Sequence, residues 1–378
     1  MDRPPASAPE AVSPAGDWAD PLGLTPEEMA PRLAAWGWPR FRAVQIFSAL
    51  QRRRVVNWEQ IRALPQPARA HLSARAPWAW PEVAGRYAAT DGTVRYLLRL
   101  WDGETVEAVY LPDEVFDGAG RVIRRRTTFC ISTQAGCPVN CQFCMTARLG
   151  LKRSLTAGEI VGQVLRLMQA HGLDDGSGGR LNLVYMGMGE PFLNYAAVMQ
   201  SVRVLTHPEG AGLSPRRITI STSGIVDKIA RFGAEPRRPQ LAISLNATSD
   251  ELRQQLMPLH RAQGGLAALT AAARAFPLRP RERLTWEYVL LAGVNDAAAD
   301  ADRLVALCAG LHAKVNLIAW NAGPDIPFAP PGEEAVRAFQ CRLTAAGLPA
   351  YVRRPRGREV YAACGQLSRQ GSAAPGGD

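Results

Sequence analysis

Apolar residues recur in short runs through the last two thirds of the chain. Between these runs, apolar residues recur with the period of a helix. Runs rich in β-branched residues favour buried strands, and apolar positions three to four residues apart favour helices. Strands are expected at 127–132, 181–186, 217–221, 241–245, 284–290 and 315–319. Helices are expected between them, for example at 157–169, 196–205 and 298–311. This alternation predicts parallel βα units.

The number of these units indicates the kind of sheet that they form. Six units are too few for the closed eight-stranded barrel, so we expect an α/β fold with an open, partial (β/α)6 barrel. In such barrels the active groups lie at the C-terminal ends of the strands. Catalytic and ligand-binding residues are therefore expected just after each of these strands.

The segment before the barrel has a different pattern. A helix is expected to begin at Pro26, with Thr25 as its N-cap and Glu28 completing a capping box. The apolar positions of a second helix are expected at Phe41, Val44, Ile46, Phe47 and Leu50. A third helix is expected from Trp58 through Ile61 and Leu64. Such a helical module could dock on nucleic acid or serve as a packing cap.

Two Asp-Gly pairs separate β-rich runs between 86 and 112, which predicts an antiparallel meander. Pro- and Ala-rich composition at the N-terminus predicts disorder there. The expected organisation is a disordered lead-in at 1–17, a helical accessory domain at 18–85, a β-meander bridge at 86–125, a barrel core at 126–367 and a disordered tail at 368–378.

Charge adds a prediction about partners. The chain has 44 Lys and Arg against 34 Asp and Glu, a net charge of +10, and its arginines are clustered. Clustered positive charge favours a polyanion such as nucleic acid, although arginine-rich composition also arises in GC-rich genomes. No apolar run reaches membrane-spanning length and no signal-peptide pattern is visible. We therefore expect a cytoplasmic protein with no membrane partner.

Three cysteines, Cys137, Cys141 and Cys144, are spaced C-x3-C-x2-C within GCPVNCQFCMTARLG. A structural zinc site and an ordinary 4Fe–4S cluster each take four protein ligands. Three thiolates on one loop can hold a 4Fe–4S cluster and leave one iron open for S-adenosylmethionine. This spacing resembles the signature of the radical SAM superfamily. The alternative is a three-cysteine zinc loop completed by a distant histidine.

Small polar or glycine residues follow several of the expected strands. Each is by itself a plausible turn or cap residue. Because they succeed one another at one end of the barrel, together they predict a polar ring around a nucleoside and a carboxylate. The ring comprises Gly189, Glu190, Ser221, Ser244, Asn246 and Asn321.

Four cysteines lie outside the triad. Cys308 and Cys341 fall in apolar helical patterns and are expected to be inert core residues. Cys130 ends an arginine-rich run, and Cys364 lies among small residues in YAACGQL. Composition alone favours a structural role for both of these.

A series of longer motifs carries a closer resemblance. Eight motifs occur in order around the cysteine loop: RFRAVQIF, VEAVYLP, MGMGEPFLN, SPRRITISTSG, AISLNAT, WEYVLLAGVND, KVNLIAWN and AACGQL. The chain resembles the RlmN/Cfr family of radical SAM RNA adenosine methyltransferases. This resemblance implies a 4Fe–4S cluster on Cys137, Cys141 and Cys144, and S-adenosylmethionine as methyl donor and radical source.

The resemblance also implies roles for the remaining site residues. Cys364 would carry the methyl group as S-methylcysteine, and the adenosyl radical would activate it for addition to adenine C2. Cys130 would then release the product through a transient disulfide, and Glu107 in VEAVY would be the proton acceptor. We expected Glu107 to be exposed on its strand. Contacts to S-adenosylmethionine carry over to Gly189, Glu190, Ser221, Ser244, Leu245, Asn246 and Asn321.

The implied partners are 23S rRNA, tRNA and an external electron donor, with the protein acting as a monomer. One departure concerns Asn246, where members of the family usually have His. Two other functions stay open. One is a Cfr-type enzyme that methylates adenine C8 in 23S rRNA, and the other is a non-catalytic RNA-binding paralogue.

Overall fold

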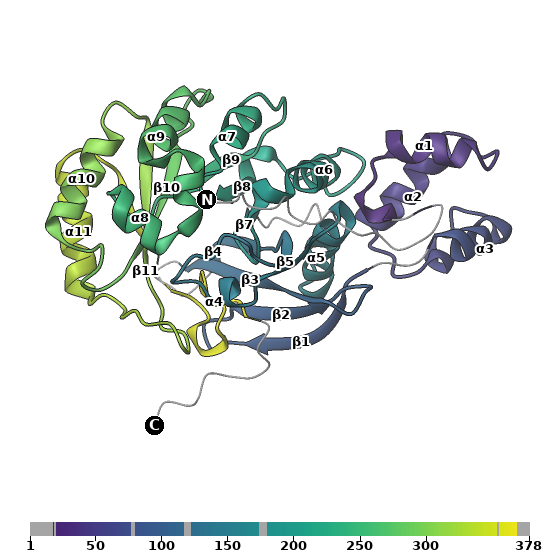
Figure 1. Ribbon diagram of the computed structural model, residues 1–378. Coiled ribbons are helices and arrows are strands. Elements are labelled where there is room, and N and C mark those ends of the chain that lie inside the picture. Colours follow the sequence, from purple (N-terminus) through teal and green to yellow (C-terminus); the bar gives the residue numbers. More distant parts are fainter. Residues whose placement is uncertain are drawn as a thin grey trace.

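The computed structural model describes residues 18, 20–76, 80–116, 122–173, 180–353 and 355–368. Ten strands of this part of the chain form one sheet, in the order β1-β2-β3-β4-β7-β8-β9-β10-β11-β12. The predicted lead-in at 1–17 lies outside the described residues. The same holds for the predicted tail at 368–378, except for residue 368. Figure 1 shows the barrel, the meander beneath it and the N-terminal helices to one side.

Seven strands run parallel and build the open barrel. They are β4 (Val122–Cys130), β7 (Arg180–Tyr185), β8 (Ile218–Thr222), β9 (Gln240–Ser244), β10 (Leu284–Leu290), β11 (Ala313–Ala319) and β12 (Ala350–Arg353). Six of them were predicted, so the expected α/β fold with parallel βα units is confirmed. The barrel is open because, in the described chain, no pairing joins β12 to β4.

Helices cover the outer face of these strands (Figure 1). They are α5 (Ala157–Ala170), α6 (Tyr195–Leu205), α7 (Val226–Gly233), α8 (Asp250–Leu256), α9 (Gly265–Ala275), α10 (Ala298–Cys308) and α11 (Glu333–Ala345). The three predicted helical segments correspond to α5, α6 and α10. In α5 a capping box starts the helix: Thr156 Oγ1 accepts from Glu159 N, and the Glu159 carboxylate accepts from Thr156 N.

The predicted meander is present and extends the same sheet. Strands β1 (Glu82–Ala88), β2 (Val94–Arg99) and β3 (Thr105–Phe116) pair antiparallel, and β3 then pairs antiparallel with β4. A second, two-stranded sheet is made by β5 (Gln134–Gly136) and β6 (Leu151–Ser154), with α4 (Met145–Arg148) between them. This small sheet was not predicted, and it encloses the cysteine loop.

The N-terminal region contains α1 (Pro26–Ala34), α2 (Phe41–Gln51) and α3 (Gln66–Arg75). The predicted capping box is confirmed, since Thr25 N donates to the Glu28 carboxylate over 2.8 Å. Short 3-10 helices occur at η1 (Pro21–Gly23), η2 (Trp58–Gln60), η3 (Pro191–Asn194), η4 (Pro215–Arg217), η5 (Pro258–Gln263) and η6 (Arg358–Val360).

One prediction for this region was wrong. The third helix begins at Gln66, because Trp58 starts only the 3-10 turn η2 and Pro65 marks the true N-cap. The expected second helix is α2, but two of its apolar residues, Phe41 and Val44, are exposed, at 54% and 38% of their surface.

A single cluster of buried apolar side chains runs from Trp18 through the barrel to Leu367. The helices and the barrel therefore share one core. Over the described residues, no helix combines the length and the apolar character that a membrane crossing requires.

The segment after β12 docks on the meander. The Glu359 carboxylate accepts hydrogen bonds from Thr90 N and Thr90 Oγ1, at 3.1 and 2.5 Å. Gly357 N donates to the Asp91 carboxylate over 3.0 Å. These contacts with the β1–β2 turn lead the chain across the gap between β12 and β4 and fix the path of the loop that follows.

Candidate active site

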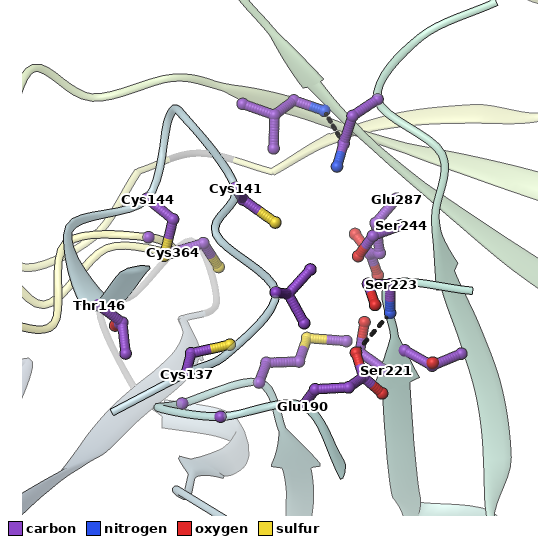
Figure 2. Close-up of a pocket in the computed structure, with 18 of the residues that line it drawn as sticks. Cys137, Cys141, Cys144, Thr146, Glu190, Ser221, Ser223, Ser244, Glu287 and Cys364 are labelled. Carbon is purple, nitrogen blue, oxygen red and sulfur yellow. Dashed lines mark hydrogen bonds between the residues drawn. The ribbon is translucent and has the colours of Figure 1, made fainter. Parts of the chain in front are cut away.

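A pocket lies at the C-terminal ends of the parallel strands, where active groups are expected in this class of fold. It is bounded by the loop between β5 and β6, by the ends of β7 to β11 and by the loop after β12 (Figure 2). Nine of the predicted site residues line it: Cys137, Cys141, Cys144, Gly189, Glu190, Ser221, Ser244, Asn246 and Cys364.

Backbone contacts fix the cysteine loop. Cys137 N donates to Gly150 O over 3.1 Å, where β5 meets β6, and Cys144 N donates to Cys141 O over 3.1 Å. Across the pocket, Met145 N donates to Gly365 O over 2.7 Å. The loop that carries the triad is thereby joined directly to the loop that carries Cys364.

The donor set of the triad fits a polynuclear cluster. Cys137, Cys141 and Cys144 all direct their sulfurs toward one pocket (Figure 2). In the described part of the chain, however, no three Cys, His, Asp or Glu side chains converge to hold a single metal ion. A mononuclear zinc site needs such convergence, whereas a 4Fe–4S cluster takes one thiolate on each of three irons. These three residues would hold such a cluster.

The electrostatics of the triad point the same way. Burial raises the pKa of the Cys141 thiol, and the nearby Cys144 and Cys137 raise it further by like-charge repulsion. Burial likewise raises the pKa of Cys137 and of Cys144. Three thiolates this close need a compensating positive charge, and bound iron would provide it because coordination to a metal deprotonates thiols.

Glu190 follows β7 and is almost fully buried in the pocket wall. Its Oε2 accepts from Ser223 N over 2.6 Å and its Oε1 from Phe192 N over 3.0 Å. Burial is the main cause that raises the pKa of this carboxyl group. Gly189 before it has φ of +101°, and a Cβ there would approach Gln134 Cβ to 2.6 Å, so the sequence requires glycine. The carboxylate is held rigidly where an ammonium group could approach.

The predicted polar ring is only partly free to bind a ligand. Ser221 and Ser244 lie at the pocket on neighbouring strands β8 and β9. The side chain of Asn246 has structural partners, because its Oδ1 accepts from Val289 N over 2.9 Å and its Nδ2 lies 3.3 Å from Met257 Sδ. The amide thus ties the end of β9 to β10 while it also lines the pocket.

Two predicted contacts to S-adenosylmethionine do not line the pocket. The side chain of Leu245 is fully buried in the core. Its backbone N–H donates to Glu287 O over 2.9 Å. Asn321 is buried after β11, outside the lining. Their expected roles as ligand contacts stay predictions.

Cys130 and Cys364 come together although they are distant in sequence. Cys130 is buried at the end of β4, and Cys364 is exposed in the pocket. Burial raises the pKa of the Cys130 thiol, and the charge of Cys364 is the second cause. Arg353 on β12 opposes the rise at both cysteines. Composition favoured a structural role for both cysteines. Such a role explains neither why Cys364 lies near Cys130 nor why its side chain is exposed.

Glu107 is fully buried in β3, so the expectation that it is exposed was wrong. Arg95 on β2 forms an ion pair with it, and Ser132 Oγ donates to its backbone carbonyl over 2.6 Å. Val109 lies opposite Cys130 in the pairing of β3 with β4, and side chains alternate along a strand. Glu107 therefore shares the face of the sheet that carries Cys130.

The prediction for two other cysteines was half right. Cys308 is buried in α10, as expected, but Cys341 is exposed on α11. The helical period of α11 was visible, yet the core-facing side of that helix belongs to Val336, Phe339 and Leu343.

Sequence reasoning missed Arg253 on α8, which is 1% exposed. Its Nε donates to Leu245 O over 2.9 Å, and its Nη2 donates to Ser223 O and Ser244 O over 2.7 and 2.9 Å. One guanidinium thus holds the ends of β8 and β9 beside the pocket. No motif signalled it, since an Arg in an amphipathic helix ordinarily faces solvent.

Sequence reasoning also missed Glu287 in the middle of β10. It lines the pocket and accepts a hydrogen bond from Asn316 Nδ2 over 2.8 Å. A charged residue inside a run of strand residues was the one available signal, because such a residue is seldom buried without a partner.

Known proteins resemble most of the chain. Residues 131–305 match the Radical SAM superfamily. A probable dual-specificity RNA methyltransferase RlmN of Koribacter versatilis is 50% identical over 340 residues, covering 88% of this chain and 97% of that protein. A dual-specificity RNA methyltransferase RlmN of Sorangium cellulosum is 46% identical over 376 residues, covering 92% of this chain and 95% of that protein.

A solved structure agrees with these relatives. The crystal structure of a radical SAM methyltransferase from Sphaerobacter thermophilus is 42% identical and superposes with a TM-score of 0.83. That similarity covers 95% of this chain and 99% of the other. Because identity and coverage are high along both sequences, the two proteins share one fold over nearly their whole length. The chain belongs to the RlmN family of radical SAM RNA methyltransferases.

Proposed function

We propose that this enzyme methylates C2 of an adenosine in 23S rRNA and in tRNA, with Cys364 as the carrier of the methyl group. The observation that carries the proposal is that Cys364, in the same pocket as the cysteine loop, lies near enough to Cys130 for its charge to be, after burial, the next cause that raises the pKa of that thiol. A radical SAM pocket that only generated a radical would need the triad alone. The second pair of thiols supports chemistry that passes through protein sulfur.

When bound, a 4Fe–4S cluster and S-adenosylmethionine supply the methyl group and a 5′-deoxyadenosyl radical. The residues of this chain have the remaining tasks. Cys364 presents its sulfur to the pocket, receives the methyl group and holds the carbon that becomes attached to adenine C2. Its exposure to the pocket supports this role, since the same sulfur has to meet both the donor and the RNA base.

Cys130 is proposed to release the product. Its sulfur attacks the Cys364 sulfur, so an S–S bond forms while the bond from Cys364 to the RNA-bound carbon breaks. The electron pair passes to that carbon, which takes up a proton and becomes the methyl group. Before that cleavage, the radical formed by addition to C2 has to lose one proton and one electron. Glu107, on the same face as Cys130, is proposed to accept the proton, and the electron would return to the bound cluster. An external thiol reductant then restores both cysteines.

The RNA is proposed to bind through phosphate contacts with the clustered arginines. Such contacts position a nucleic acid, and the extruded base is recognised in the pocket. In the cluster at 52–54, Arg52 is committed to the protein, because its Nη2 donates to Pro208 O over 2.6 Å and its Nε to Gly210 O over 3.2 Å. This arginine therefore attaches the helical module to the barrel.

We further propose that the enzyme works as a monomer in the cytoplasm, with an external electron donor for the cluster. A disulfide that forms and breaks in each cycle suits a reducing compartment.

The test is to incubate reconstituted protein with S-adenosylmethionine, a low-potential reductant and either 23S rRNA or tRNA. The RNA is then digested, and its nucleosides are identified by mass spectrometry. We expect 2-methyladenosine from both RNAs. A product at C8 would assign the enzyme to the Cfr type, and the absence of any product from a cluster-loaded preparation would leave an RNA-binding paralogue.

A further inference from the structure

Glu287 lies on the pocket wall beside Ser244, across from the cysteine loop (Figure 2). Its residue surface is only 4% exposed. Oε1 accepts from Asn316 Nδ2 over 2.8 Å, and Arg353 Nη2 lies 3.5 Å from the same oxygen. Oε2 is buried and has no hydrogen-bond partner in the described chain. One oxygen of this carboxylate is therefore fixed by the protein, while the other has no hydrogen-bond partner within the described chain.

An oxygen in this state is costly unless a ligand uses it. A buried polar atom without a hydrogen-bond partner destabilises the fold, and a charged one does so more strongly. Burial accordingly raises the pKa of the Glu287 carboxyl group, although Arg353 and Asn316 oppose the rise. Asn316 and Arg353 both act on Oε1, so they hold the side chain in place without relieving Oε2.

The position of Glu287 in the sheet suggests which part of a ligand it meets. Glu287 pairs in register with Ser244 on β9, so both lie at one level of the wall. Glu190, which suits an ammonium group, follows β7, and the strand order is β7-β8-β9-β10. The two carboxylates are thus separated by two strands, on different parts of the wall. A ligand with its amino acid end at Glu190 would direct its other end toward β9 and β10.

That other end, for S-adenosylmethionine, is a nucleoside whose ribose carries two neighbouring hydroxyl groups. Hydroxyls donate to a carboxylate oxygen, and acidic side chains bind ribose in this way in dinucleotide-binding folds. We propose that Oε2 of Glu287 accepts a hydrogen bond from a ribose hydroxyl of the nucleoside bound in this pocket. This inference rests on the proposed function only in that it takes the nucleoside to be that of S-adenosylmethionine.

The experiment compares the reconstituted holoenzyme with Glu287→Gln, and measures binding of 5′-deoxyadenosine by calorimetry. Glutamine keeps the size of the side chain and its contact with Asn316, but places an amide in place of the charged acceptor. A hydrogen bond to a charged group is strong enough that we expect binding about tenfold weaker in the variant. Glu334→Gln, an exposed change on α11, is the matched control and should bind as the unchanged enzyme does.

Two analogues locate the contact on the ligand. We expect that 2′,5′-dideoxyadenosine or 3′,5′-dideoxyadenosine, whichever lacks the donating hydroxyl, binds the unchanged enzyme and Glu287→Gln equally. Iron content and thermal midpoint, measured on every variant, should show that the fold and cluster are retained. Equal affinity of the two proteins for 5′-deoxyadenosine would overturn the proposal. It would equally be overturned if Glu287→Gln weakened all three nucleosides by the same factor.

The target adenosine of the RNA is the other nucleoside that could reach Oε2. RNA affinity, measured separately, should not change in Glu287→Gln. If RNA affinity fell while 5′-deoxyadenosine bound normally, the proposal would be wrong and Glu287 would contact the substrate base or its ribose. A failure of the C2 proposal is distinguishable, because a missing 2-methyladenosine product leaves the nucleoside binding data unaffected.

Discussion

Cys130 at the end of β4 and Cys364 in the loop after β12 lie near each other, since the charge of Cys364 is, after burial, the next cause that raises the pKa of the Cys130 thiol. Cys130 is buried, whereas Cys364 is exposed in the pocket. The pair is the part of the site from which the chemistry can be tested most directly.

Cys130→Ala should trap the RNA on the enzyme. Without the attacking sulfur, the bond between Cys364 and the methylated adenine has no route to cleavage, so a covalent RNA adduct should accumulate. Denaturing gel electrophoresis and peptide mass spectrometry would detect it and assign it to Cys364. The alanine loses one small buried sulfur at the end of a strand, so the protein should still fold.

Cys341→Ala is the control for that experiment, because Cys341 is an exposed thiol on α11. It should turn over normally and accumulate no adduct. A second control is Cys364→Ala, which should neither methylate nor form an adduct. If Cys130→Ala completed many turnovers with no adduct, the two-cysteine mechanism would be excluded.

Arg95→Met should destabilise the protein strongly. The Arg95–Glu107 ion pair is fully buried, and removal of one partner from such a pair costs about 3–5 kcal/mol because the other charge stays buried. Glu107→Gln also ends the proposed proton transfer, and it too should destabilise the protein, because it leaves the Arg95 guanidinium buried without its negative partner. Urea unfolding of both variants would measure these losses. If neither variant lost stability, the ion pair would not be a source of stability.

Glu282 should make stability depend on pH in the acid range. Arg279 and Arg238 contact its carboxylate at 2.8 and 2.9 Å, and with a backbone hydrogen bond they lower its pKa to about 2. A lowered pKa in the folded state adds stability above the unfolded value of 4.5, and that gain is lost as the pH falls toward 2.

Glu282→Gln tests this contribution. With solvent screening allowed for, the unchanged protein should exceed the variant by about 2 kcal/mol in unfolding free energy at pH 7. The difference should shrink between pH 4.5 and pH 2, as followed by urea unfolding at several pH values. A difference that stayed constant across this range would show that the loss comes from packing and not from charge.

Arg253→Met should loosen the pocket. The guanidinium donates to the carbonyls of Leu245, Ser223 and Ser244, and methionine leaves all three without that donor. We expect a loss of about 3 kcal/mol in unfolding free energy and weaker binding of S-adenosylhomocysteine. Arg337→Met, an exposed change on α11, should alter neither, and calorimetry with urea unfolding measures both properties.

Lysine at the same position makes the test sharper. Arg253→Lys keeps the charge, but one ammonium cannot reach carbonyls on two strand ends in the directions that a planar guanidinium serves. If lysine restored both stability and binding, charge and not geometry would be the contribution of Arg253.

Strand periodicity predicted the barrel well because six of its strands contribute apolar residues that are buried in the core. The seventh, β12, is short, and Tyr351 within it is exposed, so it has neither the length nor the apolar content of the others. The third N-terminal helix was misplaced for a similar reason. Trp58, Ile61 and Leu64 are all buried with helix-like spacing, but tight turns between them bury the same residues without a helix.

The same physical reasons decide which residues of the site could be predicted from the sequence. Residues on one loop or at successive strand ends could be predicted as neighbours, because the order of βα units brings those ends together. Arg253 and Glu287 could not, since their roles depend on burial that arises only from packing between distant elements. The burial of Glu107 was likewise invisible, because it needs Arg95 from the neighbouring strand.

The docking of Glu359 and Gly357 on the β1–β2 turn has a consequence for the order in which the enzyme is made. The loop with Cys137, Cys141 and Cys144 leaves the ribosome long before Cys364 does. A chain still in synthesis therefore has the proposed cluster ligands without the sulfur that is proposed to carry the methyl group. The two loops can come together only after the last strand has paired and this segment has reached the meander.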